Sequence, residues 1–465
     1  MSRTKQPPIL ILMTDQQRAD GMSCSGTGPL QTPNMDRLAA EGVRFGHACT
    51  NSPVCMPARL SFVSGLYCHN HGVWRNRGEP PADDETFFHH LQRAGYHVAY
   101  VGKSHFYSHG HGEHLGERED WMRRRGIDTV RETTGPWATA KAASWMTDEW
   151  DKQGLWDLYK ADYAKREKAG SWDARWASPL AEDDHADAMV GREAVRVIEA
   201  HADDKPLCIF VGFGGPHNPW DPPGEYAGLY DPASCPPAIP ADEGCPPAFQ
   251  PSRVERAMRG WRAPVPEPAT AEIRALYYGK IALIDKWFGE VLNAFDRRGW
   301  LDGALVVHWS DHGEMLGDHG LLHKFVFYES ALRVPLTIRW PCKIEGGRTS
   351  TALAETVDVF PTLLEAVGCE PSQRCMGRSL WPCLRDPNAS VRDAAFSEID
   401  DTTMVVTERY KYALDSRGTG YMLFDLENDP QEQENLIGTL GMQSVEQEMR
   451  GRILEWLLAT QVKQS

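Results

Sequence analysis

The sequence has neither an excess of basic residues nor a hydrophobic run long enough to cross a membrane. Among its 465 residues, 49 Lys and Arg stand against 65 Asp and Glu, which gives a formal net charge of -16 at pH 7. A nucleic-acid partner would require a dominant basic surface. No stretch approaches the ~20 apolar residues of a membrane span. We therefore expect no nucleic-acid partner and no membrane partner, and an anionic substrate would need a local cationic pocket.

The sequence also lacks the cysteine spacings of a disulfide framework or a thiolate zinc site. Its 11 cysteines are odd in number, scattered, and include no C-x-x-C pair. The first apolar run, Ile9 to Met13, is short and leads into Asp15 without a small-residue cleavage site. It is therefore typical of a β-strand rather than a signal peptide. We expect a cytoplasmic protein whose cysteines are reduced and mostly buried.

Continuous apolar runs alternate with segments of helical periodicity. The expected strands are PILILMT (8–14), HVAYVG (97–102), LCIFVGF (207–213), ALVVHWS (304–310) and VPLTIRW (334–340). Runs of this kind are typical of strands buried on both faces of a parallel sheet. The expected helices are 32–42, 86–96 and 271–299. The alternation predicts an α/β fold with a mostly parallel central sheet flanked by helices.

The composition changes along the chain and predicts two domains. We expect a large α/β domain over 1–345 and a smaller C-terminal α+β domain over 346–465, which begins with hairpin strands and closes with a helix near 443–461. A Trp-rich insertion at about 116–180 covers the substrate entrance, forms a subunit contact or simply packs. A Pro-rich segment at about 216–268 is expected to be a long ordered loop.

Candidate site residues follow the expected strands. Ligands bind at the carboxyl ends of strands in open α/β sheets, and the residues at these positions are Asp15, Gln16, Lys103, His105, His217, Asp311, His312 and, on the next loop, Lys324. Their carboxylate, amide and imidazole groups suit one divalent cation, bound by Asp15, Gln16, Asp311 and His312. The remaining basic groups suit a tetrahedral oxyanion, held by Arg59, Lys103, His105, His217 and Lys324.

Cys55 is expected at the start of a short helix over 57–64. Pro57 lies near the first turn and Gly65 ends the helix. The exposed N–H groups and the dipole of a helix N-terminus favour an anion. From these residues alone three interpretations stand: a buried structural thiol, a thiolate nucleophile of low pKa, or the precursor of another nucleophile.

The stretch CMPARLSFVSG, which begins at Cys55, resembles the C-x-P-S/A-R-x-x-x-x-x-G signature of the sulfatase family, members of the alkaline phosphatase superfamily. Further stretches match the family: ILMTDQQR (11–18), TPNMDRLAAEGVRF (32–45), GKSHF (102–106), GPHNPW (215–220), SDHGEMLGDHGLLHK (310–324), ERYKY and DLENDP. The resemblance implies an alkaline-phosphatase-like fold. It also implies that a formylglycine-generating enzyme oxidises Cys55 to formylglycine, which hydrates to a geminal diol.

The resemblance assigns a role to each candidate. Cys55 becomes the nucleophile and, with Asp15, Gln16, Asp311 and His312, a metal ligand; Arg59 supports the diol; Lys103 and Lys324 bind sulfate oxygens. His105 and His217 protonate the leaving group and deprotonate the second hydroxyl, in an order that the sequence does not assign. Asn76 resembles a substrate-contacting asparagine of bacterial relatives, with a loop hydrogen bond as the alternative.

The implied reaction is hydrolysis of a small-molecule sulfate monoester to an alcohol and inorganic sulfate, and by analogy we expect a homo-oligomer. Many sulfatases have Asp where this chain has Gln16 and Asn where it has His312. The expected metal is therefore calcium or manganese. Relatives that cleave phosphonate monoesters and phosphodiesters share Gln and His at these positions, so such esters are the alternative substrates. Lys103 and His105 favour sulfate.

Two further interpretations keep Cys55 unmodified. One is a metallophosphatase of the same superfamily, and the other is a noncatalytic metal-binding protein. In the second, the loop SHFYSHGHGEH could hold a separate zinc ion through His109, His111 and His114. The leaving group is left open, because the resemblance is weakest over the Trp-rich and Pro-rich segments.

Overall fold

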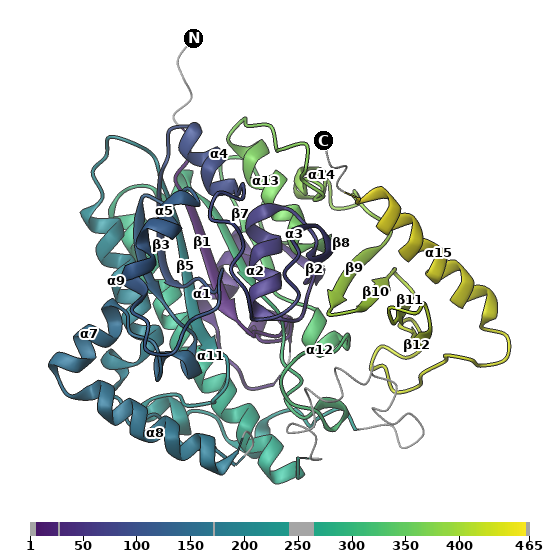
Figure 1. Cartoon of the computed structure of the whole chain (residues 1–465), viewed down its shortest axis with the longest axis horizontal. Helices are drawn as coiled ribbons and strands as arrows, with labels where there is room; N and C mark the ends of the chain where they lie inside the picture. The colour runs from purple at the N-terminus through teal and green to yellow at the C-terminus, as the bar shows by residue number, and fades with distance from the viewer. Residues whose placement is uncertain (1–5, 27, 171–172, 241–264, 462–465) are drawn as a thin grey trace.

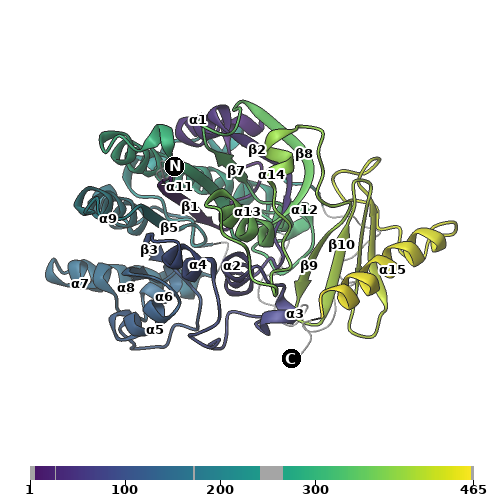
Figure 2. The ribbon, with the colours of Figure 1, turned by 90° about the horizontal axis from the view of Figure 1, so that it is seen from above.

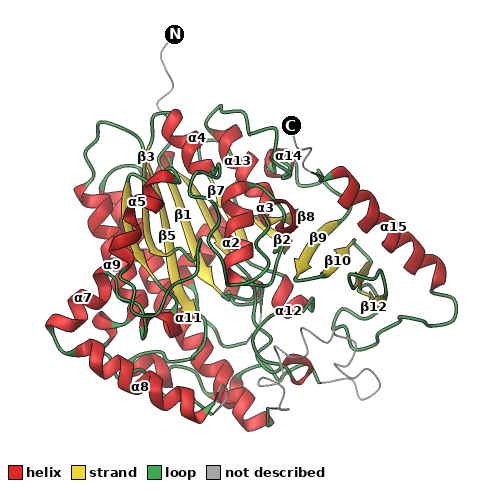
Figure 3. Ribbon diagram, in the orientation of Figure 1, coloured by secondary structure: helices red, strands yellow, loops and turns green. Residues whose placement is uncertain are grey.

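A computed structural model of the chain describes residues 6–26, 28–170, 173–240 and 265–461. It contains an eight-stranded sheet flanked by helices and a separate four-stranded antiparallel sheet (Figures 1 and 3). The strands of the large sheet are β1 (Ile9–Asp15), β2 (Val43–Cys49), β3 (His97–Lys103), β4 (Thr129–Thr133), β5 (Leu207–Pro216), β6 (Leu305–Ser310), β7 (Leu336–Arg339) and β8 (Arg348–Glu355). The predicted α/β class is confirmed.

The large sheet is mixed, in the order β4-β3-β5-β1-β6-β7-β2-β8. The five strands from β4 to β6 are mutually parallel. Strand β7, the expected strand at 334–340, pairs antiparallel with both β6 and β2, so its predicted parallel direction is wrong. The chain between β6 and β7 contains no long crossover helix, and it returns directly to the neighbouring position. Because β7 is buried along its whole length, its apolar run does not reveal its direction.

Helices cover both faces of this sheet. The α-helices of the described chain are α1 (Pro33–Glu41), α2 (Cys55–Ser64), α3 (Cys68–His71), α4 (Phe87–Arg93), α5 (Glu119–Arg124), α6 (Pro136–Thr139), α7 (Trp145–Lys152), α8 (Leu155–Ala169), α9 (Ala186–Ala200), α11 (Glu267–Arg297), α12 (Glu329–Leu332), α13 (Val359–Ala366), α14 (Trp381–Arg385) and α15 (Gln443–Ala459), the last of which packs on the C-terminal sheet. The three expected helices form as α1, α4 and α11. Helix α11 begins earlier than expected because Pro268 fits its first turn.

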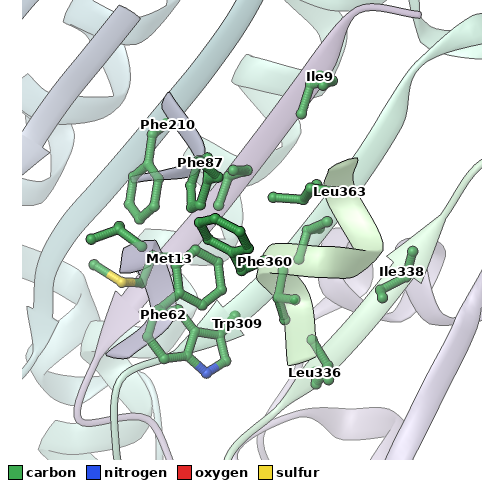
Figure 4. Close-up of a cluster of buried hydrophobic side chains, with 14 of the residues drawn as sticks. Ile9, Met13, Phe62, Phe87, Phe210, Trp309, Leu336, Ile338, Phe360 and Leu363 are labelled. Atoms are coloured by element: carbon green, nitrogen blue, oxygen red, sulfur yellow. The ribbon is translucent and has the colours of Figure 1, made fainter. Parts of the chain in front are cut away.

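Strand β1 separates two hydrophobic cores. Ile9 and Met13 face a core that contains α2, α4 and α13, whereas Leu10 and Leu12 face a core that contains α1, α9 and α11 (Figure 2). Figure 4 shows the first core around Phe62 of α2. The burial of both faces explains why the strand is apolar without alternation.

The Trp-rich and Pro-rich segments are parts of the larger fold. Strand β4, inside 116–180, is an edge strand of the large sheet. Trp150 packs with Tyr159 in a small core that also contains Met189 of α9. Of the Pro-rich segment, 241–264 lies outside the described residues. The part before it contains short 3-10 turns at Gly224–Gly228 and Pro232–Ser234. No helix of the described chain is both long and apolar enough to span a membrane.

The C-terminal sheet has the order β12-β11-β10-β9 and is antiparallel throughout. Its strands are β9 (Ala395–Ile399), β10 (Thr402–Val406), β11 (Tyr410–Leu414) and β12 (Gly420–Asp425), and α15 packs on it through Met449, Ile453 and Trp456 (Figure 1). Residues 348–355 lie after the expected boundary at 345 but form β8, which pairs with β2 in the large sheet. The division into two domains stays a prediction.

Candidate active site

Helix α2 presents Cys55 at its N-terminus. The helix begins at Cys55, two residues before the expected start, and the Cys55 side chain is buried. Phe62 stacks on Trp309 of β6 with ring centroids 4.0 Å apart, which fixes the helix against the sheet. Gly65 ends the helix at φ +68, a conformation that favours glycine, and its N–H donates to the carbonyl of Ser61.

Four side chains converge at the carboxyl ends of β1 and β6. Asp15 ends β1, and Asp311 and His312 follow β6, its parallel neighbour. One ligand atom from each of Asp15, Cys55, Asp311 and His312 lies within 4.8 Å of the others, and all four residues are buried. Strand ends in the sequence predicted Asp15, Asp311 and His312 at one sheet edge, and the structure brings these three together with Cys55 of α2.

The donor atoms of this cluster suit a divalent cation. Asp15 Oδ1 is buried and has no hydrogen-bond partner among the described residues. His312 Nδ1 hydrogen-bonds to the carbonyl oxygen of Gly313 at 2.9 Å, so in the neutral ring the lone pair is on Nε2, which lies 3.1 Å from Cys55 Sγ. An unpartnered carboxylate oxygen, a second carboxylate and an oriented imidazole form a cation site that two negative charges neutralise.

Gln16 lies beside the cluster, but its side-chain amide has other partners. Its Oε1 accepts from Lys324 Nζ, and its Nε2 donates to Glu314 Oε2. Its main-chain N–H donates to Asp311 Oδ1 at 2.9 Å. The structure therefore places Gln16 between the carboxylates and Lys324, and the side-chain oxygen of Gln16 accepts a hydrogen bond from the Lys324 ammonium.

Arg59 bridges the two carboxylates. Its Nη2 donates to Asp15 Oδ2 at 2.7 Å and its Nε to Asp311 Oδ2 at 2.8 Å. Burial would lower the pKa of Arg59, but Asp311 and Asp15 outweigh burial and raise it. In turn, burial raises the pKa of Asp311, whereas Lys103 and Arg59 overcome burial at Asp15 and hold its pKa below the usual range. Arg59 thus fixes the carboxylates that face Cys55.

Two lysines make the surroundings of Cys55 strongly cationic. Lys103 Nζ donates to Asp15 Oδ2, and Lys324 Nζ lies 2.8 Å from His217 Nε2. Burial alone would raise the pKa of the Cys55 thiol, but Lys324 and Lys103 outweigh it and hold the pKa well below its ordinary value. The site therefore stabilises negative charge at the position of Sγ.

His105 and His217 are both neutral at the site. Burial, with Lys103 nearby, lowers the pKa of His105 to about 3, and burial with Lys324 nearby lowers the pKa of His217 to about 4. Because an ammonium only donates, His217 Nε2 accepts from Lys324. His105 Nδ1 is buried without a hydrogen-bond partner in the described part of the chain. Each histidine can accept a proton in this state.

Asn76 caps helix α2. Its Oδ1 accepts from the main-chain N–H of Met56 at 2.9 Å. This is a local hydrogen bond of the kind expected as the alternative to substrate contact. The bond places the Asn76 side chain one residue from Cys55.

The histidines of the loop SHFYSHGHGEH do not converge. His109 faces Glu132 at 3.8 Å, and His114 pairs with Asp148 at 3.1 Å. His111 is exposed. Within the described ranges, the cluster around Cys55 is the one group of three or more His, Cys, Asp or Glu ligands close enough to hold a metal ion. The structure therefore gives no support to a separate zinc site.

Lys280 is a site residue that the sequence did not reveal. It lies in the middle of α11 and is 1% exposed. Its Nζ donates to the main-chain oxygens of His217 at 3.1 Å and Pro219 at 3.2 Å and to Asp221 Oδ1 at 2.8 Å. A lysine within a long amphipathic helix carries no motif, so no sequence signal pointed to this contact.

Comparison with protein families identifies two matching regions. Residues 7–369 match the family model described as Sulfatase. Residues 317–458 match the family model described as N-sulphoglucosamine sulphohydrolase, C-terminal. Together the two matches cover the large sheet, every residue of the cluster, the C-terminal sheet and α15 up to residue 458.

Curated relatives are similar along nearly the whole chain. The arylsulfatase of Clostridium perfringens is 28% identical over 93% of this chain and 91% of that protein. The choline-sulfatase of Rhizobium meliloti is 29% identical over 93% of this chain and 83% of that protein. Among solved structures, the phosphonate monoester hydrolase SpPMH from Silicibacter pomeroyi superposes with a TM-score of 0.82 at 23% identity, covering 98% of this chain and 96% of that chain. The last similarity confirms the fold.

Proposed function

Because this chain belongs to the sulfatase family, we propose that it hydrolyses a small-molecule sulfate monoester with a nucleophile derived from Cys55. The chain is a sulfuric ester hydrolase by its family and its relatives. The observation that carries the proposal is the 3.1 Å approach of Cys55 Sγ to His312 Nε2, inside a buried cluster with Asp15 and Asp311. A structural thiol has no need of these neighbours.

We propose that Cys55 is oxidised to formylglycine by a formylglycine-generating enzyme. The hydrated aldehyde supplies an oxygen nucleophile whose second hydroxyl allows the sulfated product to collapse without another attack at sulfur. Position 55 supports this use, because the N-terminus of α2 and the two lysines stabilise negative charge there. A serine would offer no such second hydroxyl.

Asp15, Asp311, His312 and the modified side chain of residue 55 would hold one calcium or manganese ion. When bound, the ion lowers the pKa of a hydroxyl at residue 55 and stabilises charge on the ester oxygens. Arg59 holds both carboxylates in place. Gln16 Oε1 is a further candidate ligand beside them, now bonded to Lys324.

We assign the ester oxygens to Lys103 and Lys324. Both ammonium groups point into the cluster, one toward Asp15 and the other toward Gln16 and His217. They supply the local cationic pocket that an anionic ester requires in a chain of net charge -16. Each would donate to a sulfate oxygen and neutralise charge that builds up during transfer.

We assign protonation of the leaving alcohol to the pair of His217 and Lys324. Lys324 Nζ and His217 Nε2 are hydrogen-bonded at 2.8 Å, so the pair would supply a proton to a departing oxygen. The neutral His105, with Nδ1 unpartnered among the described residues, would take the proton from the second hydroxyl. Replacing His217 should slow the hydrolysis of esters with poor leaving groups most. Replacing His105 should slow the release of sulfate from the sulfated residue 55, the step that restores the aldehyde.

The test combines mass spectrometry with turnover. Purified, active enzyme is digested, and the mass of the peptide carrying Cys55 is measured beside sulfate release from an aryl sulfate. The proposal expects the aldehyde form in active preparations and no turnover in Cys55→Ala. An unmodified thiol in fully active enzyme would refute it.

Phosphonate monoesters and phosphodiesters form a second candidate substrate class. Gln16 and His312, which stand where many sulfatases have other residues, support phosphonate monoesters and phosphodiesters as substrates. Lys103 and His105 support sulfate esters as substrates. Measuring kcat/KM for matched aryl esters of sulfate, phosphonate and phosphodiester decides the preference. We expect the largest kcat/KM for the sulfate ester and low activity on the other two.

A further inference from the structure

A cavity of about 250 Å³ lies behind the nucleophile helix. It is lined by the second half of α2, by α3, by Phe360 of α13, by the loop at 80–85 and by Arg125, which follows α5. In Figure 1, α2, α3 and α13 lie close together, and α2 contacts both of the others. Leu60 and Ser64 line it, whereas Cys55 begins the same helix, roughly 7.5 Å from Leu60 and roughly 13.5 Å from Ser64 along the helix axis. The cavity is therefore distinct from the active site.

Arg125 is a buried cation without a carboxylate partner in this cavity. The side chain is 1% exposed, and among the described residues it forms no ion pair and its Nε has no hydrogen-bond partner. Nη1 donates to the carbonyl oxygen of Pro81 at 2.9 Å, and the guanidinium lies over the ring of Trp121 at 4.9 Å. Burial lowers the pKa of Arg125 to about 10, so the group keeps its charge at neutral pH. A buried charge in this state favours an anion that pairs with it.

The charges around the cavity leave room for one anion. Of its two acidic residues, Glu85 is neutralised by Arg93 at 2.6 Å, whereas Asp84 lies near Arg125 without forming an ion pair. Arg374 also lines the cavity and has no ion-pair partner in the described chain. Three arginines against two carboxylates leave one positive charge.

The apolar residues that line the cavity favour a ligand with an apolar part. Leu60, Leu66, Pro80 and Phe360 are apolar residues that line the same space. His71 is neutral there, because burial lowers its pKa to about 3; its Nε2 hydrogen-bonds to Ser61 Oγ. Hence the histidine adds no second positive charge for a dianion.

We propose that this cavity binds a small organic monocarboxylate, whose carboxylate pairs with Arg125 and whose apolar part contacts Leu60 and Phe360. The planar fork of an arginine matches the two oxygens of a carboxylate. The site depends on neither the metal cluster nor the chemistry at Cys55. It also differs from the active site in offering apolar walls.

The experiment measures binding of benzoate to the full chain by calorimetry, in the presence of excess inorganic sulfate so that oxyanion sites are already filled. Benzamide is the neutral control of equal shape. We expect saturable binding of benzoate and none of benzamide. Arg125→Gln should weaken benzoate binding at least tenfold, and Asp84→Asn should tighten it because the nearby negative charge is removed.

A third variant covers the case in which Arg125→Gln does not fold. Ser64→Phe, on the cavity side of α2, fills the space and should also abolish binding while circular dichroism remains that of the parent. The proposal is overturned if benzoate does not bind, if benzamide binds equally well, or if excess sulfate removes the signal. It is also overturned if folded Ser64→Phe and Asp84→Asn bind benzoate as the parent does.

Discussion

Lys280 Nζ donates a hydrogen bond to the main-chain oxygen of His217 at 3.1 Å. The same ammonium is paired with Asp221 at 2.8 Å, so one buried side chain of α11 ties the loop that carries His217 to the helix. Lys280 touches none of the reacting groups, and its effect on the reaction must pass through the position of His217. It is therefore a positioning residue.

Lys280→Met should loosen this loop and leave Asp221 as an unpaired buried charge. We expect a loss of ~3 to 5 kcal/mol in the free energy of unfolding. We also expect kcat to fall most for aryl sulfates with poor leaving groups, because His217, the proposed proton donor, is displaced. The measurement is the dependence of kcat on leaving-group pKa. The double variant Lys280→Met/Asp221→Asn should regain stability but not the wild-type slope; an unchanged slope in both variants would contradict the positioning role.

Arg59→Lys tests the bridge between the two carboxylates. A lysine keeps the charge but cannot reach Asp15 and Asp311 with a planar fork, so both carboxylates lose their orientation. We expect metal affinity or kcat to fall by ~10- to 100-fold. Metal content by elemental analysis and kcat are measured together. Arg37→Lys, at a partly exposed pair with Glu41, is the matched control and should change neither; equal behaviour of the two variants would refute the bridge.

Removing divalent metal should abolish sulfate release and lower the melting temperature. Asp15 and Asp311 lie together in the buried cluster, and Asp15 Oδ1 has no other partner among the described residues, so a bound cation stabilises the folded state. Chelator-treated enzyme is assayed and melted with and without added calcium or manganese. Recovery of both properties on addition of either ion is the expected result. Full activity after verified removal of metal would contradict the proposed cation.

The pH dependence of stability can be tested at His308, in the middle of β6. The ring is fully buried, and neither nitrogen has a hydrogen-bond partner among the described residues; burial lowers its pKa to about 3. The unfolded chain therefore binds a proton that the folded chain does not, and the free energy of unfolding falls as pH drops from about 6.5 toward 3. In His308→Leu this fall should be shallower between about pH 7 and pH 5. Urea unfolding at pH 7 and pH 5 measures the change in the free energy of unfolding, with the exposed His111→Leu as control. An equal change in wild type and His308→Leu would show the prediction to be wrong.

The sequence predicted three members of the cluster because Asp15, Asp311 and His312 follow strands, whereas Cys55 begins α2 and was assigned to the metal through the family resemblance. Asp15 and Asp311 each follow a continuous apolar run, and parallel neighbours bring such ends together. The direction of β7 was not predictable in this way, since burial on both faces makes parallel and antiparallel strands equally apolar. The edge strand β8 alternates in burial and was missed.

Contacts between segments that are distant in the sequence could not be predicted either, for a different reason. Lys280 pairs with Asp221, in a loop about sixty residues earlier in the sequence. Arg125 donates a hydrogen bond to the carbonyl oxygen of Pro81, which lies before α4 and β3 in the sequence. Neither residue lies in a motif, and a charged residue in a helix is usually solvated. The Gln16 amide was expected at the metal, whereas the structure shows it between Lys324 and Glu314.

The most direct test of the account is the chemical form of residue 55 in active enzyme. The peptide that carries Cys55 is isolated from a preparation of known turnover, and its mass is measured. The account predicts the aldehyde form, in which one oxygen replaces the sulfur and two hydrogens are lost, at a fraction that rises in proportion to specific activity. A free thiol in a fully active preparation would contradict it.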